Sequence, residues 1–526
     1  MAENNKTATA PPGTATADPR RWKALGVLAI VQLMLLLDAT VVNVALPSIK
    51  SDLQFSESGL TWVVSAYLLA AGGLLLLGGK IADLIGRRRV FIFGTVLFAI
   101  ASVIAGAAQT SAMLIVGRVL QGAAEGLVAP AALSMVALLF TNSTERAKAF
   151  SIWASLAGLG STLGVLFSGV LTDLASWRWI FYINIIFVVA ALVLIRLVVD
   201  ESKAPEGRRI DVPGAVLVTA GLVALMQAIL AASTHPLGST IVVVPLVIGV
   251  ALLAAFVVVE SRTDQPLLPL RFFGDRTRVT GYVTVVANAS TSAAVFFILV
   301  LYMQNVLGYT PLQAGLAWLP FCLAFMPGLF FSMTLMQRAG VRVTLAVGLV
   351  VSAIGVLLLS RVPVDGVYVV DLLPAMIVTS LGFAITAPAM QNAATHALTA
   401  EDAGLGAGVV TTVQQMGQAL GLTVFVTVAL ARTSAVQAST ASSAATAGYQ
   451  IAFLVAAAAL VIGAVVAPLI LRRSVDEAVV DHAEGSDDER WAGPPAEAEA
   501  KAVASDQKTS DSTVDDPDMA AGFRRR

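Results

Sequence analysis

The sequence predicts an all-α integral membrane protein made of two related six-helix bundles with two further helices inserted between them. The composition is the first observation: of 526 residues, 57% are hydrophobic and 13% are charged, whereas soluble globular chains carry about 25% charged residues. The second is a series of apolar stretches long enough, at ~1.5 Å per helical residue, to cross the ~30 Å hydrocarbon core of a bilayer. The third is a pair of motifs that recur about half a chain apart.

Fourteen stretches have the length and composition of membrane-spanning helices. Lysine and arginine set their orientation, because positively charged loops stay on the cytoplasmic side of the membrane. With the amino terminus placed there, seventeen Lys and Arg residues lie in inner connections and four in outer ones. We therefore expect both ends of the chain to be cytoplasmic. The stretches lie at about 24–46, 59–79, 90–108, 112–138, 148–172, 178–198, 212–232, 240–259, 279–303, 313–336, 342–360, 368–390, 404–430 and 449–471.

Two pairs of motifs indicate an internal repeat. "LIGRRRVFIFG" (Leu84–Gly94) follows the second stretch, and "RAGVRVTLAVG" (Arg338–Gly348) follows the tenth, at an offset of 254 residues. "VAPAALSM" (Val128–Met135) and "TAPAMQNA" (Thr386–Ala393) are 258 residues apart. Stretches one to six are therefore predicted to recur as stretches nine to fourteen, with seven and eight inserted. Repeats of this kind are typical of secondary transporters.

The chain divides into five predicted segments. The two ends are polar, and neither is expected to pack into a core. The amino-terminal arm shows no charged region followed by a short apolar core, so no cleavable signal is expected. The carboxy-terminal tail is strongly acidic, with fourteen acidic and six basic residues. The segments are an arm at 1–21, a bundle at 22–198, the inserted helices and linkers at 199–278, a second bundle at 279–473 and the tail at 474–526.

The sequence argues against an enzyme or a primary pump. The single cysteine, Cys322, lies in an apolar stretch, and His235, His396 and His482 are far apart. These residues provide neither a disulfide framework nor a metal-ligand pattern. No G-x-x-x-x-G-K-[ST] motif offers a nucleotide site. We expect no cofactor, and an ion gradient is the remaining energy source.

Charged residues inside the fourth stretch indicate a functional path. "GRVLQGAAEG" contains Arg118, Gln121 and Glu125. Arg118 and Glu125 are nearly two turns apart at ~3.6 residues per turn, so the three form one polar stripe. A charge at the centre of a bilayer costs about 2.5–3.5 kcal/mol on insertion scales. We therefore expect the stripe to face a water-filled cavity.

Asp38 lies near the middle of the first stretch, on a different side of the helix from Gln32 and Asn43. We hypothesise that Asp38 and Glu125 bind protons and that Arg118 approaches one of them. A low dielectric favours the neutral carboxyl, whereas a nearby arginine favours the carboxylate. Purely structural roles are the alternative for each of these residues, with Asp38 as a buried hydrogen-bonding group and Arg118 bonded to backbone carbonyls.

Polar and aromatic residues inside other stretches are candidates for lining a substrate cavity. Aromatic rings beside an acid would bind a lipophilic cation through cation–π contacts. Packing between helices is the alternative for each of them. The candidates are Gln32, Asn43, Gln121, Trp62, Tyr67, Trp153, Asn288, Phe296, Trp318, Gln414 and Gln415.

Three motifs carry a resemblance that covers Trp22 to Arg473. "GGKIADLIGRRRV" (Gly78–Val90) resembles the cytoplasmic signature of the major facilitator superfamily. "LDATVVNVALP", which contains Asp38, is similar to the first-helix signature of its fourteen-helix drug:proton antiporter branch, and "GRVLQGAAEG" resembles the fourth-helix signature of the superfamily. The resemblance implies a conformational latch, for which positive-inside anchoring is the alternative. The residues at the latch positions are Gly79, Asp83, Gly86, Arg87, Arg88 and Arg89.

The fifth and sixth helices depart from the antiporter pattern. "GLGSTLGVLFSGV" has Val165 where proline is usual and Ser168 where a glycine is usual, and Ile186 replaces a proline in the sixth helix. The resemblance still implies a monomeric transporter of the bacterial cytoplasmic membrane with no nucleic-acid partner. It would export lipophilic, often cationic, drugs or antibiotics in exchange for protons by alternating access. A narrow-substrate exporter of a metabolite or lipid-like compound, a uniporter and a membrane receptor are the alternatives.

Overall fold

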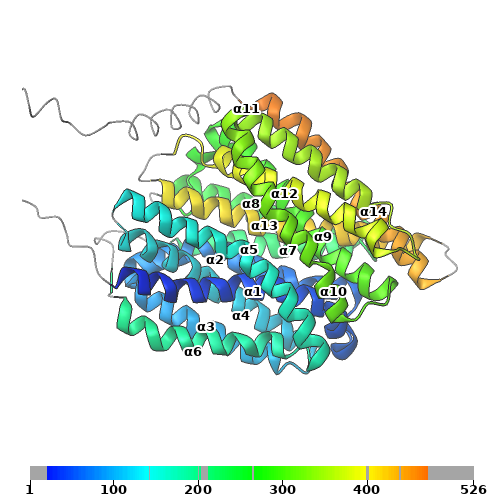
Figure 1. The fold of residues 1–526 in the computed structure, drawn as a ribbon, viewed down its shortest axis with the longest axis horizontal. Coiled ribbons are helices and arrows are strands. Elements are labelled where there is room, and N and C mark those ends of the chain that lie inside the picture. The colour runs from blue at the N-terminus through cyan, green and yellow to red at the C-terminus, as the bar shows by residue number, and fades with distance from the viewer. Residues whose placement is uncertain are drawn as a thin grey trace, which may run out of the picture. The chain divides into compact units, whose positions relative to one another are not determined.

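The structure, a computed structural model, describes residues 20–140, 142–199, 201–202, 211–263, 266–398, 402–436 and 440–471. Regular structure in these ranges is helical (Figure 1). The predicted arm and acidic tail lie outside these ranges, apart from Arg20 and Arg21. The α-helices are α1 (Arg21–Leu53), α2 (Glu57–Ile85), α3 (Arg87–Gly106), α4 (Ser111–Leu139), α5 (Ser143–Leu174), α6 (Trp179–Val198), α7 (Val212–Ala231), α8 (Thr240–Arg262), α9 (Arg276–Leu301), α10 (Pro311–Ala317), α11 (Leu319–Leu359), α12 (Leu373–Ala394), α13 (Ala403–Ala435) and α14 (Ala441–Ile470). Short helical turns are η1 (Leu270–Gly274), η2 (Tyr302–Val306) and η3 (Tyr368–Leu372).

Each predicted stretch falls on a helix, although the spans divide differently. Eleven helical segments of the described chain are long and apolar enough to cross a membrane. One of them, Pro311–Leu359, has 49 residues, more than twice the ~20 that a bilayer requires. It contains the predicted stretch 313–336 and, apart from its last residue, the predicted stretch 342–360. The described apolar parts of α5 and α6, Thr162–Leu174 and Trp179–Ile195, are shorter segments.

The helices form two similar bundles. In the first, α4 packs against α2 and α3, and α1 packs against α5 and α6. In the second, α11 packs against α12 and α14, and α9 packs against α13 and α14. Figure 1 shows α1–α6 as one group, coloured blue to green, and α9–α12 with α14 as another, coloured green to orange.

Two glycines mark the repeat in the backbone itself. Gly86, between α2 and α3, has φ 124°, and its counterpart Gly340 has φ 81° at a bend inside α11. Glycine alone adopts such angles without strain. The contacts repeat as well: a Cβ at Gly94 would lie 2.6 Å from Val128, and one at Gly348 would lie 2.5 Å from Thr386. The motif pairs therefore occupy equivalent places in the two bundles.

Helices α7 and α8 form the insertion. They pack against each other, and α7 also contacts α2 of the first bundle and α13 of the second. Gly73 allows α2 to approach Thr219 of α7, since a Cβ there would overlap the threonine hydroxyl. The hydroxyl of Thr427 on α13 donates to the carbonyl of Ile229 at 3.2 Å. The inserted pair is thus attached to both bundles.

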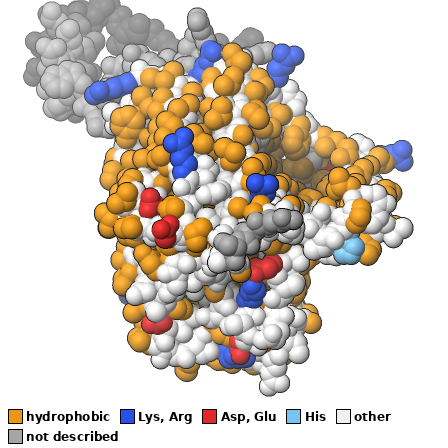
Figure 2. All heavy atoms as spheres, turned by 90° about the vertical axis from the view of Figure 1, so that its right-hand side faces the viewer, with side chains coloured by type: hydrophobic (Ala, Val, Ile, Leu, Met, Phe, Trp, Pro, Cys, Tyr) orange, Lys and Arg blue, Asp and Glu red, His pale blue; other side chains and the backbone are white. Residues whose placement is uncertain are grey.

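The bundles meet along α2 and α13 and along α5 and α10. Small residues allow these approaches: a Cβ at Gly315 would lie 3.3 Å from the Cα of Gly169. Gln304 of η2 also donates to the carbonyl of Val44 in α1 at 2.7 Å. Hydrophobic side chains cover much of the surface in Figure 2, and charged ones are few and scattered. Such a surface suits lipid better than water.

Candidate functional site

A fully buried ion pair lies at the centre of the first bundle. Nη1 of Arg118 on α4 donates to Oδ2 of Asp38 on α1 at 2.6 Å. The side chains of Asp38 and Arg118 are 0% and 1% exposed. Desolvating two charges costs several kcal/mol per ion, so such a pair persists only if further hydrogen bonds satisfy the remaining atoms.

Those further bonds come from α4 itself and from two other helices, α3 and α6, and complete the cluster. The carboxylate oxygen Oδ1 of Asp38 accepts hydrogen bonds from Nε2 of Gln121 at 2.9 Å and from Nδ2 of Asn184 on α6 at 2.7 Å. The Ser102 hydroxyl on α3 accepts from Gln121 at 2.9 Å and from Asn184 at 3.3 Å. We call Asp38, Arg118, Gln121, Asn184 and Ser102 the buried polar cluster.

Arg118 also ties α4 to α2. Its Nε donates to the carbonyl of Val63 at 2.9 Å, and its Nη1 donates to Oε1 of Gln121 at 2.8 Å. The guanidinium carbon lies 4.1 Å from the centre of the Tyr67 ring, which adds a desolvated cation–π contact. The cation is held by a carboxylate, a backbone carbonyl and an aromatic face, so any change in the charge of Asp38 would act on three helices.

Only one end of the predicted polar stripe of α4, at Glu125, is accessible; the other two residues are buried. Arg118 and Gln121 point into the first bundle and are buried. The expectation that they line a water-filled cavity is therefore wrong for this conformation. The physical reason is that protein groups take the place of water around them. Glu125, one turn beyond Gln121, is partly exposed and lies at the border between the bundles.

Glu125 reaches across that border. Its Oε1 accepts a hydrogen bond from Nε2 of Gln415 on α13 at 3.2 Å. Its Oε2 and the hydroxyl of its neighbour Tyr67 are buried and close enough to interact with each other, but neither makes a well-aligned hydrogen bond, and Oε1 of Gln415 is buried without a partner. Buried polar atoms are nearly always paired in native proteins, so these incompletely bonded atoms mark a place where a further polar or charged group would be stabilised.

The other cavity candidates divide into several groups. Phe296 stacks on Trp318 with ring centres 4.2 Å apart and an angle of 4°, which is a packing role. Asn43 donates to carbonyls of its own helix. Asn288 is buried and its Oδ1 has no hydrogen-bond partner, and the same holds for Oε1 of Gln32. The partly buried members are Trp62, Trp153 and Gln414.

The latch residues surround the turn between α2 and α3. Asp83 and Arg87 form an ion pair of 2.7 Å. Nη1 of Arg88 donates to the carbonyl of Val199 at 2.9 Å. Gly86 supplies the positive φ, and Gly79 packs against Pro130 of α4, which a Cβ would approach to 3.6 Å. The motif therefore joins α2, α3 and α4 to the segment that follows α6.

Sequence reasoning missed three residues of these sites. Glu201 accepts backbone N–H bonds from Arg88 at 3.1 Å and Arg89 at 3.2 Å, so its charge lies at the amino terminus of α3, where an anion is favoured. Ser102 and Asn184 complete the buried polar cluster. Asn184 carried a usable signal, because it is an amide within the apolar run of the sixth stretch. Nothing in the sequence distinguished Ser102 from a serine bonded to its own helix.

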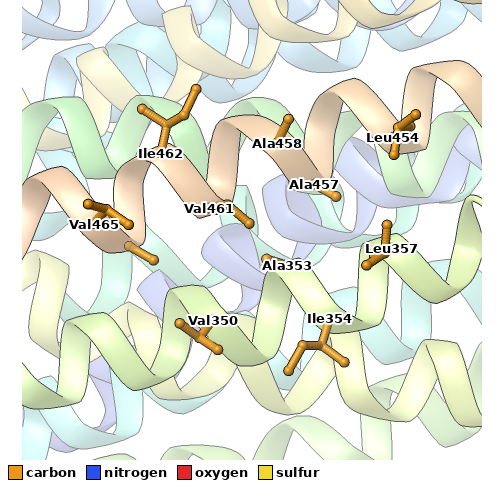
Figure 3. Close-up of a pocket in the computed structure, with 11 residues that line it drawn as sticks. Val350, Ala353, Ile354, Leu357, Leu454, Ala457, Ala458, Val461, Ile462 and Val465 are labelled. Carbon is orange, nitrogen blue, oxygen red and sulfur yellow. The ribbon is translucent and has the colours of Figure 1, made fainter.

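An apolar groove of about 600 Å³ lies between α11 and α14. Figure 3 shows valine, leucine, isoleucine and alanine side chains along it. Many of them are exposed, as Ile354 at 49% and Ile462 at 63% illustrate. The groove offers no group that could bind a charge, and its lining is that of a lipid-facing surface.

Comparisons with known proteins identify the family. The model of the Major Facilitator Superfamily matches residues 28–422. The chain is 38% identical to the puromycin resistance protein pur8 of Streptomyces alboniger, over 86% of this chain and 92% of that protein. It is 39% identical to the lincomycin resistance protein of Streptomyces lincolnensis, over 78% and 84%. It is 36% identical to the cephamycin export protein CmcT of Amycolatopsis lactamdurans, over 87% and 94%.

Solved structures share the fold at low sequence identity. A bacterial homologue of the human lysosomal transporter Spinster, in an inward-facing and unoccupied conformation, matches with a TM-score of 0.61 and 15% identity, covering 87% of this chain and 98% of that one. The peptide transporter POT in complex with sulfate matches with a TM-score of 0.62 and 17% identity, covering 88% and 98%. The chain therefore belongs to the major facilitator superfamily and is a multi-pass membrane transporter, not an enzyme.

Proposed function

We propose that this protein exports lipophilic, often cationic, drugs or antibiotics in exchange for protons by alternating access. The names of its relatives support the substrate class, since three of them are antibiotic resistance or export proteins. The observation that carries the coupling is the buried ion pair of Asp38 and Arg118. Ionisable residues buried within membrane-spanning helices typically mark functional sites, and a buried ion pair adds little net stability that would otherwise account for it.

Proton binding at Asp38 would change the contacts of several helices at once. A neutral Asp38 carboxyl loses most of its attraction for the Arg118 guanidinium, which is then left buried with the Val63 carbonyl and the Tyr67 ring. A buried charge without its counterion is strongly unfavourable. The cation would move toward water or another acceptor and shift α4 relative to α1 and α2. Such a shift would link proton binding to the change between inward-open and outward-open states.

Glu125 is the proposed meeting point of proton and substrate. Its Oε2, the Tyr67 hydroxyl and Gln415 lie together at the border between the bundles. A lipophilic cation placed there would bind the carboxylate and contact the aromatic ring. A proton on Glu125 would remove that attraction. Competition between proton and cation for one carboxylate is a direct physical basis for exchange.

The membrane orientation and energy source belong to the same proposal. The positively charged connections favour a cytoplasmic location for both termini, in the cytoplasmic membrane of a bacterium. The protein would act as a monomer, without a cofactor and with the proton gradient as its energy source. The latch, whose Asp83 and Arg87 are paired at 2.7 Å, would then lie at the cytoplasmic surface and hold this end of the first bundle.

A narrow-substrate exporter or a uniporter is the second candidate, and the departures in the fifth helix favour it. Ser168 donates a hydrogen bond to the carbonyl of Val41 in α1, and Val165 contributes its backbone to the contact with Gly315. These residues fasten α5 to its neighbours where the antiporter pattern has glycine and proline. A more firmly held α5 would restrict the range of substrates.

Efflux of ethidium from energised cells tests the proposal. Wild type should expel the dye, and a protonophore should abolish the efflux. Asp38→Asn should abolish it as well with normal membrane insertion, because an amide cannot bind and release a proton beside Arg118. Asp173→Asn, which changes an exposed carboxylate, is the matched control and should behave as wild type.

Two results would contradict the proposal in different ways. Efflux that continues in Asp38→Asn and with protonophore would exclude proton coupling through Asp38. If well-inserted wild type expels none of a panel of unrelated cationic dyes, the narrow-substrate alternative is favoured.

A further inference from the structure

Two acidic residues outside the proposed transport path lie at one end of the inserted helices. Asp211 precedes α7, and its Oδ1 accepts the N–H of Gly214 at 2.9 Å, which caps the helix. Glu260 lies near the end of α8, and its Oε2 accepts the N–H of Leu268 at 3.3 Å. Asp211 is 7% exposed and Glu260 is 3% exposed. Each carboxylate therefore has one oxygen engaged by the backbone.

The other two oxygens are buried without a hydrogen-bond partner. They are Oδ2 of Asp211 and Oε1 of Glu260. Both approach the same point: a Cβ at Gly214 would lie 2.6 Å from the first and 3.0 Å from the second. Glycine leaves this place open. The two free oxygens thus converge from α7 and α8.

Within the part of the chain that the structure describes, the charges around this pair do not balance two carboxylates. The charged groups that act on Glu260 are Asp211 and Lys80 of α2. Lys80 also donates to the carbonyl of Pro266 at 2.8 Å, so it is shared with the connection after α8. Two buried carboxylates that face each other do not both stay ionised, and one proton held between them satisfies both free oxygens.

We propose that Asp211 and Glu260 share one proton and form a second proton-binding site at the base of the inserted helices. The proton enters from water and returns to it, and no covalent bond within the protein changes. Its loss would leave two facing negative charges beside Lys80. Because α7 contacts both α2 and α13, the resulting separation of α7 and α8 would be transmitted to the helices where the bundles meet. This site does not depend on whether Asp38 couples transport to protons.

The pH dependence of thermal unfolding tests the shared proton. The purified full chain in lipid nanodiscs should unfold at a lower temperature as pH rises, because the folded state loses the proton and gains repulsion between the carboxylates. Glu260→Gln should flatten this fall, since its amide donates to Asp211 at every pH. Asp211→Asn should flatten the fall in the same way, because its amide would donate to Glu260 at every pH. The test therefore still stands if one of the two variants fails to fold. Glu57→Gln, an acid exposed at the far end of α2, should keep the slope of wild type.

Infrared spectroscopy and sodium provide the decisive controls. The band of a protonated carboxyl group should be present in wild type near neutral pH and should lose intensity in Glu260→Gln but not in Glu57→Gln. Equal intensity in these two variants, or the absence of the band from wild type, would overturn the proposal. A rise in the unfolding temperature of wild type but not of Glu260→Gln, when sodium replaces choline at constant ionic strength, would show a cation site instead.

Discussion

At the scale of single residues, the molecule concentrates its buried charge at one point of the first bundle. Asp38 makes three side-chain hydrogen bonds, to Arg118, Gln121 and Asn184. These bonds form only when α1, α4 and α6 are correctly positioned relative to one another. The hydroxyl of Ser102 on α3 orients the Gln121 and Asn184 amides by accepting a hydrogen bond from each. Fully satisfied networks of this kind make an arrangement rigid, and a single missing partner makes it costly.

The ion pair is expected to show strong coupling in a double-mutant cycle. Asp38→Ala and Arg118→Ala should each cost about 3–5 kcal/mol, because each leaves an uncompensated buried charge. The double variant should cost clearly less than the sum of the two single ones. The measurement is the unfolding equilibrium in mixed detergent micelles.

The exposed pair Lys50–Glu57, whose side chains are 30% and 46% accessible, is the matched control for this cycle. Its coupling should stay below about 1 kcal/mol. Simple addition of the two single costs at Asp38 and Arg118 would mean that the buried contact contributes no coupling energy.

At the scale of elements, glycines determine where helices turn and how closely they pack. Gly86 ends α2 with a positive φ, and Gly340 bends α11 at the equivalent place in the second bundle. The carboxylate of Glu201 fills the space beside Gly86, because a Cβ there would lie 2.6 Å from its Oε1. The turn and the anion at the start of α3 therefore form one local structure.

Gly86→Ala should lower stability by roughly 1–3 kcal/mol, because it adds backbone strain and displaces Glu201. Gly340→Ala should also lower stability, because alanine would be strained at the positive φ of the bend in α11. Gly26→Ala is the control, since a Cβ at this helical position meets no atom within 4 Å, and it should be neutral or stabilising by about 0.5–1 kcal/mol. Thermal unfolding midpoints of the three variants provide the comparison, and a Gly86→Ala midpoint equal to that of Gly26→Ala would contradict it.

At the scale of the whole transmembrane unit, the bundles touch through small residues and a few polar contacts. The α5–α10 contact brings Gly169 against Gly315, and the α2–α13 contact brings Gly72 against Gln415. Contacts made mainly by glycines can separate at little cost, because few side chains must be repacked or resolvated. This is what a change between two arrangements of the bundles requires.

Gly169→Ala should weaken this contact and alter dye efflux. A Cβ at Gly169 would lie 2.8 Å from the carbonyl oxygen of Pro311 and 3.1 Å from the Cα of Leu312 in α10, so α5 and α10 could no longer approach as closely. Gly26→Ala, where a Cβ meets no atom within 4 Å, is the matched control and should expel ethidium as wild type does. Unchanged efflux in well-inserted Gly169→Ala would show that transport does not need the close α5–α10 contact.

Much of the architecture follows from the sequence because the hydrocarbon core of a bilayer offers no hydrogen bonds to the backbone, which restricts spanning segments to a few structures. Each membrane-crossing helix must be predominantly apolar along its length, so the sequence of one segment is enough to locate that helix in the chain. The sequence also revealed the repeat, because both copies of the motif keep a glycine, Gly86 or Gly340, at a position where the backbone has a positive φ. The family follows from the same motifs, and the match to residues 28–422 confirms it.

The sequence by itself determined the helices, the repeat, the family and the charged residues that lie inside spans. Only the tertiary structure decided which of these residues meet: that Arg118 pairs with Asp38 and turns away from water, that Glu125 reaches Gln415, and that Asp211 faces Glu260. The reason is that hydropathy is a property of one segment, whereas the rotation and tilt of a helix are set by packing against its neighbours. Contacts between residues far apart in the chain depend on these packing details.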